Sequence, residues 1–214
     1  MKTIILASLK GGVGKSTLAM NLGLWLPNSL IIDADAGQGS LMKFYKRRIQ
    51  AAKMTGTVLP EIDVQPIKMK AELETLLKNN QHKEFIVIDT PGTAREQDYL
   101  QYIYSKADLI ITPIPCAGFG LEEGVIFYQK MEKLFPGKVR AILLADGFAT
   151  RIFKASRRLA KQYQLKTYYH MISQATAIAA SPAEGKSIFE YAPNSKPARN
   201  MEHLFNEVLE DVRH

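Results

Sequence analysis

The chain reads Ile4-Ile5-Leu6-Ala7 and, after two further residues, Lys10-Gly11-Gly12-Val13-Gly14-Lys15-Ser16-Thr17. Leucines at helical spacing follow, so an apolar strand, a glycine-rich turn and a helix succeed one another, which is the setting of a phosphate-binding loop. Glycine lets backbone N–H groups face a phosphate without a Cβ clash, and the helix start adds partial positive charge. We expect Lys15 to reach the β- and γ-phosphates and the Ser16 hydroxyl to bind Mg²⁺.

Two later apolar runs end in carboxylates. Asp33 and Asp35 close the first run, in Ile32-Asp33-Ala34-Asp35, and Asp89 closes the second, Phe85-Ile86-Val87-Ile88-Asp89. In open α/β sheets the carboxyl ends of the strands are where ligands bind. Oxygen ligands suit Mg²⁺, so we expect Asp33 and Asp89 beside the metal and its waters, and Asp35 positioning or deprotonating the attacking water.

Length and periodicity predict one α/β domain over residues 1–214, doubly wound, with a mostly parallel sheet and helices on both faces. The expected strands cover 3–8, 29–33, 84–89, 108–114, 138–145 and 166–172, with an edge strand near 62–67. The expected helices cover 15–26, 40–53, 69–80, 95–105, 120–135, 151–164, 174–180 and 197–212. The segment 54–66 has the weakest pattern and is expected to be mainly loop.

The phosphate-loop spacing departs from G-x-x-x-x-G-K-[ST], because Leu9 stands at the first glycine and Lys10 adds a second lysine. The form K-G-G-x-G-K-[ST] resembles the deviant Walker A box of the ParA/MinD superfamily of ATPases. The resemblance implies an ATP site formed by Lys10, Gly11, Gly12, Val13, Gly14, Lys15, Ser16 and Thr17. It also implies that Lys10 reaches the partner subunit's phosphates in a nucleotide-sandwich dimer, so that Lys10, Lys15 and Asp35 are the catalytic set.

The other boxes extend this likeness. The pair Asp33 and Asp35 resembles the superfamily's Walker A′ motif, whose second aspartate is tied to hydrolysis, and Asp89 resembles the Walker B carboxylate. With Ser16, Asp33 and Asp89 form the expected Mg²⁺ set. Thr90-Pro91-Gly92 resembles the switch segment that senses the γ-phosphate. The likeness continues to the C-terminal segment 171–191, where it is less specific.

The formal net charge is +7, and the charge is uneven. No acidic residue interrupts the stretch from Arg151 to Lys166, which carries the candidate DNA-binding residues Arg151, Lys154, Arg157, Arg158 and Lys161. A cationic helix can contact phosphates without reading bases. A second basic cluster comprises Lys43, Lys46, Arg47, Arg48 and Lys53; its pattern fits a solvated helix or an interface equally well.

The whole pattern is similar to a short ParA-type partition ATPase. That likeness implies ATP-dependent dimerisation, binding to non-specific double-stranded DNA, and a ParB-like centromere-binding adaptor that stimulates slow hydrolysis. The protein is then expected in the cytoplasm, associated with the nucleoid. A MinD-like ATPase that cycles on a membrane is the main alternative; however, the C-terminal helix is rich in acids, so stable membrane association is not expected. An ATPase that positions a transfer complex or receptor array stays open, whereas the lone Cys116 excludes a nitrogenase-type reductase.

Overall fold

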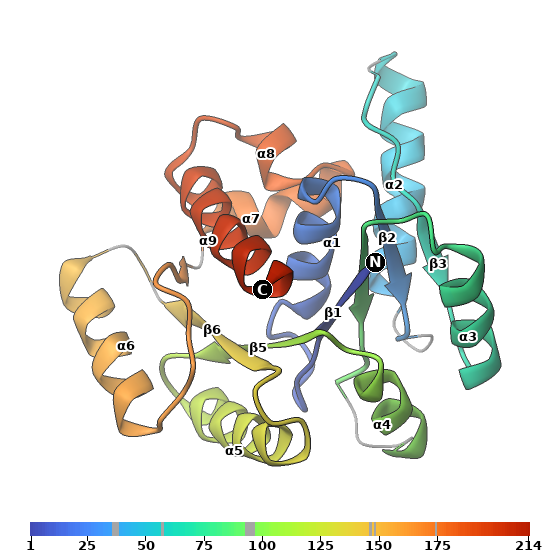
Figure 1. The fold of residues 1–214 in the computed structure, drawn as a ribbon. Helices are drawn as coiled ribbons and strands as arrows, with labels where there is room; N and C mark the ends of the chain where they lie inside the picture. Colours follow the sequence, from blue (N-terminus) through green and yellow to red (C-terminus); the bar gives the residue numbers. More distant parts are fainter. Residues whose placement is uncertain (36–38, 57, 93–96, 146, 148, 174) are drawn as a thin grey trace.

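A computed structural model describes residues 1–214 except 36–38, 57, 93–96, 146, 148 and 174. Its sheet has seven parallel strands in the order β3-β2-β4-β1-β5-β6-β7 (Figure 1). The strands are β1 (Lys2–Leu6), β2 (Ser29–Asp33), β3 (Val64–Pro66), β4 (Phe85–Asp89), β5 (Leu109–Pro115), β6 (Val139–Ala145) and β7 (Ile172–Ser173). The predicted class, a doubly wound parallel sheet in a single domain, is confirmed.

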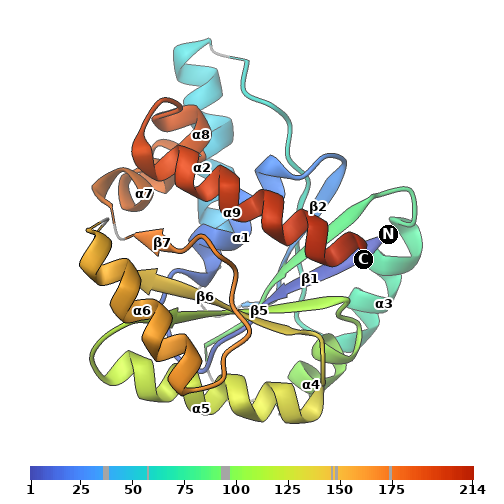
Figure 2. The ribbon, with the colours of Figure 1, turned by 60° about the vertical axis from the view of Figure 1, so that its left-hand side comes forward.

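Helices cover both faces of the sheet, because alternate residues of each buried strand point to opposite sides. Ile5 packs with helices α3 to α6, whereas Ile4 and Leu6 pack with α1, α2, α8 and α9. Figure 2 shows α9 above the strands and α5 below them. The helices are α1 (Lys15–Trp25), α2 (Ser40–Thr55), α3 (Lys70–Asn79), α4 (Gln97–Ser105), α5 (Phe119–Leu134), α6 (Thr150–Gln162), α7 (Thr176–Ala180), α8 (Ile188–Tyr191) and α9 (Lys196–Arg213), with a 3₁₀ turn η2 at Ser181–Glu184.

The expected strand over 166–172 is wrong for most of its length. Only Ile172–Ser173 is a strand, preceded by an isolated bridge between Ala141 and Thr167. The backbone N–H groups that a ladder needs are donated to side chains instead: that of Lys166 to the Tyr128 hydroxyl, and those of 169 and 170 to the Glu207 carboxylate. These N–H groups are therefore satisfied by side chains from distant parts of the sequence, and the segment does not need to pair with a strand. The short elements η2 and α8 were not expected.

The C-terminal part of the chain is bound to α2 through a buried arginine. Arg48, 4% exposed, donates to both carboxylate oxygens of Glu190 at 2.6 and 2.9 Å, to the carbonyl of Pro60 and to that of Gly185. Burial alone would raise the pKa of Glu190, but the hydrogen bonds and charge of Arg48, together with two hydrogen bonds from Ser187, outweigh it and lower the pKa. Arg48 is thus a structural residue, so both interpretations offered for its basic cluster were wrong for this member. Among the described residues no helix is long and apolar enough to cross a membrane.

Candidate nucleotide-binding site

The phosphate loop leaves β1 at the centre of the sheet and enters α1. Gly12 and Gly14 have φ angles of 76° and 88°, which favour glycine because a Cβ is strained there. Gly14 caps α1 without a side-chain hydrogen bond, and the first turn holds no acidic residue. The first N–H groups of α1 therefore keep their capacity to bind an anion, as the sequence predicts.

Lys15 is held inside the loop. Its side chain is 6% exposed, and Nζ donates to the Ser8 hydroxyl at 3.1 Å and to the Lys10 carbonyl at 3.3 Å. Burial lowers the pKa of Lys15, and the negative charges of Asp89 and Asp35 partly oppose this. A cation in this partly dehydrated position interacts with a phosphate more strongly than one in open solvent does.

Two carboxylates stand side by side next to this lysine. Asp33 and Asp89 face each other in the β2–β4 register, at the carboxyl ends of neighbouring strands, and each is 1% exposed. Asp33 accepts the N–H groups of Asp35 and Met42 at 3.1 and 3.2 Å. Burial raises the pKa of Asp33, and these hydrogen bonds partly oppose the rise. The structure thus brings together the two predicted metal-binding carboxylates.

Asp89 has close polar neighbours, the Ser16 hydroxyl and the Lys15 ammonium, but among the described residues neither of its carboxylate oxygens has a well-formed hydrogen bond. Burial raises the pKa of Asp89 to about 7, although the nearby Ser16 hydroxyl and Lys15 oppose the rise. A buried carboxylate without a donor is costly unless something else binds it. The donor set of Asp89, Asp33 and Ser16 consists of the oxygens that Mg²⁺ prefers, so these residues fit that ion.

The segment after β4 packs directly on the phosphate loop. The Thr90 hydroxyl donates to the Leu6 carbonyl at 2.8 Å. At Gly92 an added Cβ would lie 2.8 Å from the Gly11 nitrogen and 2.9 Å from the Lys10 carbonyl carbon, which leaves no room for a side chain. Movement of this segment would therefore be transmitted to the loop. Residues 93–96, which follow it, lie outside the described residues.

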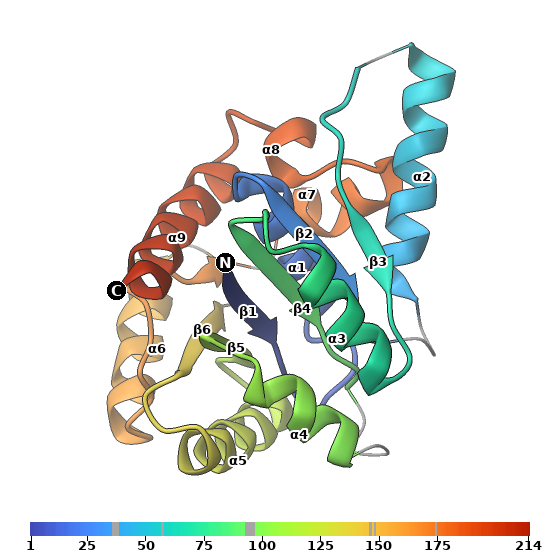
Figure 3. The ribbon, with the colours of Figure 1, turned by 45° about the vertical axis from the view of Figure 1, so that its right-hand side comes forward.

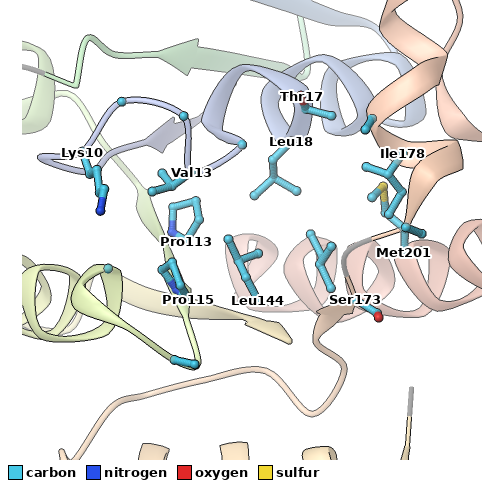
Figure 4. A pocket seen from close by; sticks show the side chains of 18 residues that line it. Lys10, Val13, Thr17, Leu18, Pro113, Pro115, Leu144, Ser173, Ile178 and Met201 are labelled. Atoms are coloured by element: carbon cyan, nitrogen blue, oxygen red, sulfur yellow. The ribbon is translucent and has the colours of Figure 1, made fainter. Parts of the chain in front are cut away.

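A cavity of about 540 Å³ opens beside the loop. Figure 4 shows Val13, Thr17 and Leu18 on one wall and Pro113, Pro115 and Leu144 opposite them, with Ile178 and Met201 toward the far end. A mostly apolar pocket next to a phosphate loop suits a nucleoside. Val13 and Thr17 belong to the predicted ATP site; the sequence did not predict the other lining residues, because they come from separate elements, α1, β5, β6, α7 and α9.

Lys10 lies at the edge of this cavity and remains accessible. Its side chain is 47% exposed, and Nζ is 3.6 Å from a carboxylate oxygen of Glu123 in α5. Exposed ion pairs of this kind contribute little to stability, so the side chain is free to exchange partners. Glu123 and Ser8 are two polar neighbours of the site that sequence reasoning missed. Ser8 could have been found from the sequence, because its hydroxyl follows the first strand directly before the phosphate loop, whereas nothing in the sequence around Glu123 indicates a place near the site.

The predicted basic stripe lies on α6, at the edge of the fold in Figure 1. Arg151, Lys154, Arg158 and Lys161 are exposed and lie on one side of the helix. Arg157 differs, because its guanidinium donates to the Thr167 hydroxyl and the Tyr169 carbonyl and lies over the Phe153 and Tyr169 rings. Its charge is therefore engaged within the chain. The other four residues present the accessible positive surface of this helix.

Comparison with known proteins identifies the family of the chain. The family model described as ATPase MipZ matches residues 2–119. The chromosome-partitioning ATPase Soj of Thermus thermophilus is 23% identical over 245 residues, covering 100% of this chain and 97% of the relative. A chain of the solved MinC:MinD cell division protein complex of Aquifex aeolicus superposes with a TM-score of 0.76 at 17% identity, covering 98% of this chain and 96% of that one.

A second solved structure, pNOB8 ParA bound to nonspecific DNA, gives a TM-score of 0.59 at 17% identity over 99% of this chain and 97% of that one. At such identities the solved structures establish the fold alone, whereas the family model covers more than half of the chain. The chain therefore belongs to the ATPase MipZ family, in the ParA/MinD superfamily of partition ATPases, and is an ATP-hydrolysing enzyme.

Proposed function

We propose that this ATPase drives DNA partition through a cycle of ATP-dependent dimerisation, non-specific DNA binding and hydrolysis stimulated by a ParB-like adaptor. The observation that carries the proposal is the contrast between the two lysines of the loop. Lys15 is buried against its own loop, whereas Lys10 is exposed at the edge of the cavity. This contrast supports a division of roles in which Lys15 serves the nucleotide of its own subunit and Lys10 serves that of a second subunit.

The residues divide the chemistry as follows. The N–H groups of residues 11–17 and the Lys15 ammonium bind the phosphates, and Lys10 of the facing subunit adds a charge as negative charge spreads in the transition state. Asp35 orients the attacking water and accepts its proton. Ser16, Asp33 and Asp89 would hold Mg²⁺, which would supply positive charge against the phosphates. Hydrolysis is slow in the absence of the adaptor.

The exposed stripe of α6 is the proposed DNA contact. Arg151 and Lys161 are ten residues apart, so four cations extend over about 15 Å of helix. Such a row suits the phosphates of a duplex and reads no bases. Four phosphate contacts predict that log K falls with log salt with a slope of about −4, independent of DNA sequence. Arg157, being engaged within the chain, is a minor contributor.

Gel retardation of random duplex DNA with ATP, ADP or no nucleotide tests the cycle. We expect retardation with ATP only, and its loss in Lys10→Ala, which prevents dimerisation. Arg158→Gln should weaken retardation and reduce the salt slope by about one. Lys133→Gln, which removes an exposed charge from α5, is the matched control and should leave both unchanged. Equal retardation in all nucleotide states would refute the proposed switch.

The second candidate is an ATPase that positions a protein cargo rather than DNA. It is favoured by the likeness to a chain of the MinC:MinD complex, which superposes with the higher TM-score of the two structures described. Light scattering would then still detect the ATP-dependent dimer, blocked from turnover by Asp35→Asn, while DNA retardation is absent. A monomer under these conditions refutes both candidates.

A further inference from the structure

The helix α2 carries a basic surface that the nucleotide cycle does not use. Between Ser40 and Pro60 the chain has five basic residues and no acidic one, and only Arg48 of the five is buried. At 100° per residue the other four lie on one side of the helix, and Met54 shares that side. We call this set the α2 ridge: Lys43, Lys46, Arg47, Lys53 and Met54.

The ridge projects from the molecule. In Figures 1 and 3, α2 and the segment after it extend beyond the sheet and its other helices. Apolar side chains are exposed at its far end: Met54 is 79% exposed and Val58 is 95% exposed, and Ile49 is 40% exposed on the flank. The far end of α2 and the segment after it therefore combine exposed cations with exposed apolar side chains.

The ridge is also held in place. Arg48 bonds on one side to Glu190 and Gly185 and on the other to the Pro60 carbonyl, so it fixes both α2 and the segment that carries Val58. Glu190 is engaged by Arg48 and by Ser187, so its charge does not offset the four exposed cations of α2. The four ridge cations therefore form a preorganised surface with unopposed charge along α2 itself.

We propose that the α2 ridge docks reversibly on the surface of an anionic phospholipid bilayer. The cations meet the headgroups, and Met54 and Val58 enter the apolar boundary beneath them. Duplex DNA fits less well, because its phosphates would engage the cations and leave the exposed Met54 and Val58 without an apolar partner. An acidic protein segment fits less well too, because a projecting helix is convex and gives no groove to enclose an anchor. The contact is peripheral and independent of the DNA-binding proposal.

Vesicle flotation tests the docking with the full chain in ADP, without DNA. The vesicles contain phosphatidylcholine alone or with phosphatidylglycerol. We expect binding only to the anionic vesicles and release at high salt. The variant Lys46→Gln/Arg47→Gln/Lys53→Gln should bind about a hundredfold more weakly, at about fivefold per cation. Met54→Ser should weaken binding by about tenfold while the net charge stays unchanged.

The matched control also replaces two lysines and one arginine by glutamine, but on the other basic surface, α6. Lys154→Gln/Arg158→Gln/Lys161→Gln on α6 should retain the parent's vesicle binding. Thermal melting verifies folding, and Met54→Ser provides a mild variant should the triple variant unfold. The proposal is overturned if the parent protein does not bind anionic vesicles, or if the α2 triple variant and Met54→Ser bind them as tightly as the parent. It is also overturned if the α2 and α6 triple variants lose vesicle binding equally. Loss of DNA retardation in the α2 variant, with vesicle binding intact, would assign the ridge to nucleic acid instead.

Discussion

Replacing Asp89 by asparagine should stabilise the nucleotide-free protein while removing its response to Mg²⁺. The side chain is 1% exposed, and its pKa is raised from 3.8 to about 7. A rise of this size corresponds to about 4 kcal/mol against the ionised form at pH 8. An unpartnered buried amide in its place costs about 1–3 kcal/mol. The net gain is about 2 kcal/mol, which raises Tm by about 4–8 °C in a protein of this size.

The sign of the pH dependence follows from the same pKa. Because the folded-state pKa of Asp89 lies above its ordinary value, the native state keeps a proton that the unfolded state releases between pH 3.8 and about 7. This contribution to stability is fully present below the lower value, declines as the pH rises, and is constant above the upper value. The advantage of Asp89→Asn should accordingly grow over this range and then level off.

Differential scanning fluorimetry over a pH series, with and without ATP and Mg²⁺, measures both effects. The parent should gain stability when ATP and Mg²⁺ are added together, whereas Asp89→Asn should respond to ATP alone and gain nothing from Mg²⁺. An asparagine variant less stable than the parent at pH 8, or one whose advantage is independent of pH, would refute the reasoning that burial dominates this carboxylate.

Three further outcomes follow from the packing. Arg48→Met should lower the free energy of unfolding by about 3 kcal/mol, because it removes the cation from the partly buried Glu190 and leaves that carboxylate only its hydrogen bonds from Ser187. Arg47→Met on the exposed side should change the free energy of unfolding by under about 0.5 kcal/mol; urea unfolding measures both, and equal effects would contradict the assignment. Gly185→Ala should lower the free energy of unfolding by at least about 2 kcal/mol in the same assay, because the added Cβ would lie 2.6 Å from the Arg48 backbone and the residue has a φ of 65°. Parent-like stability would show that α2 can shift to make room for the Cβ at little cost. Gly92→Ala should weaken binding of a fluorescent ATP analogue about tenfold or more by displacing the phosphate loop, with folding checked by circular dichroism, and unchanged affinity would show that the contact is loose.

Much of the fold was predictable because its signals are local. A glycine-rich turn between an apolar strand and a helix, and apolar runs ending in Asp33 and Asp89, require no knowledge of distant residues. The parallel sheet then follows, since strands separated by helices are joined by crossovers. In the register, these two carboxylates face each other, as their shared place at strand ends suggested.

The sequence alone determined the class of the fold, the phosphate loop and the acids of the site, because each is encoded within a few adjacent residues. Only the tertiary structure decided that Arg48 is buried and connects α2 to the C-terminal part of the chain, that Arg157 bonds within the chain, and that 166–171 forms no strand. In each case the deciding partner lies ten or more residues away in sequence, as Glu190 does from Arg48, Thr167 from Arg157 and Glu207 from His170. Solvated and buried arginines look alike in a sequence, since what separates them is whether distant acceptors arrive to replace water.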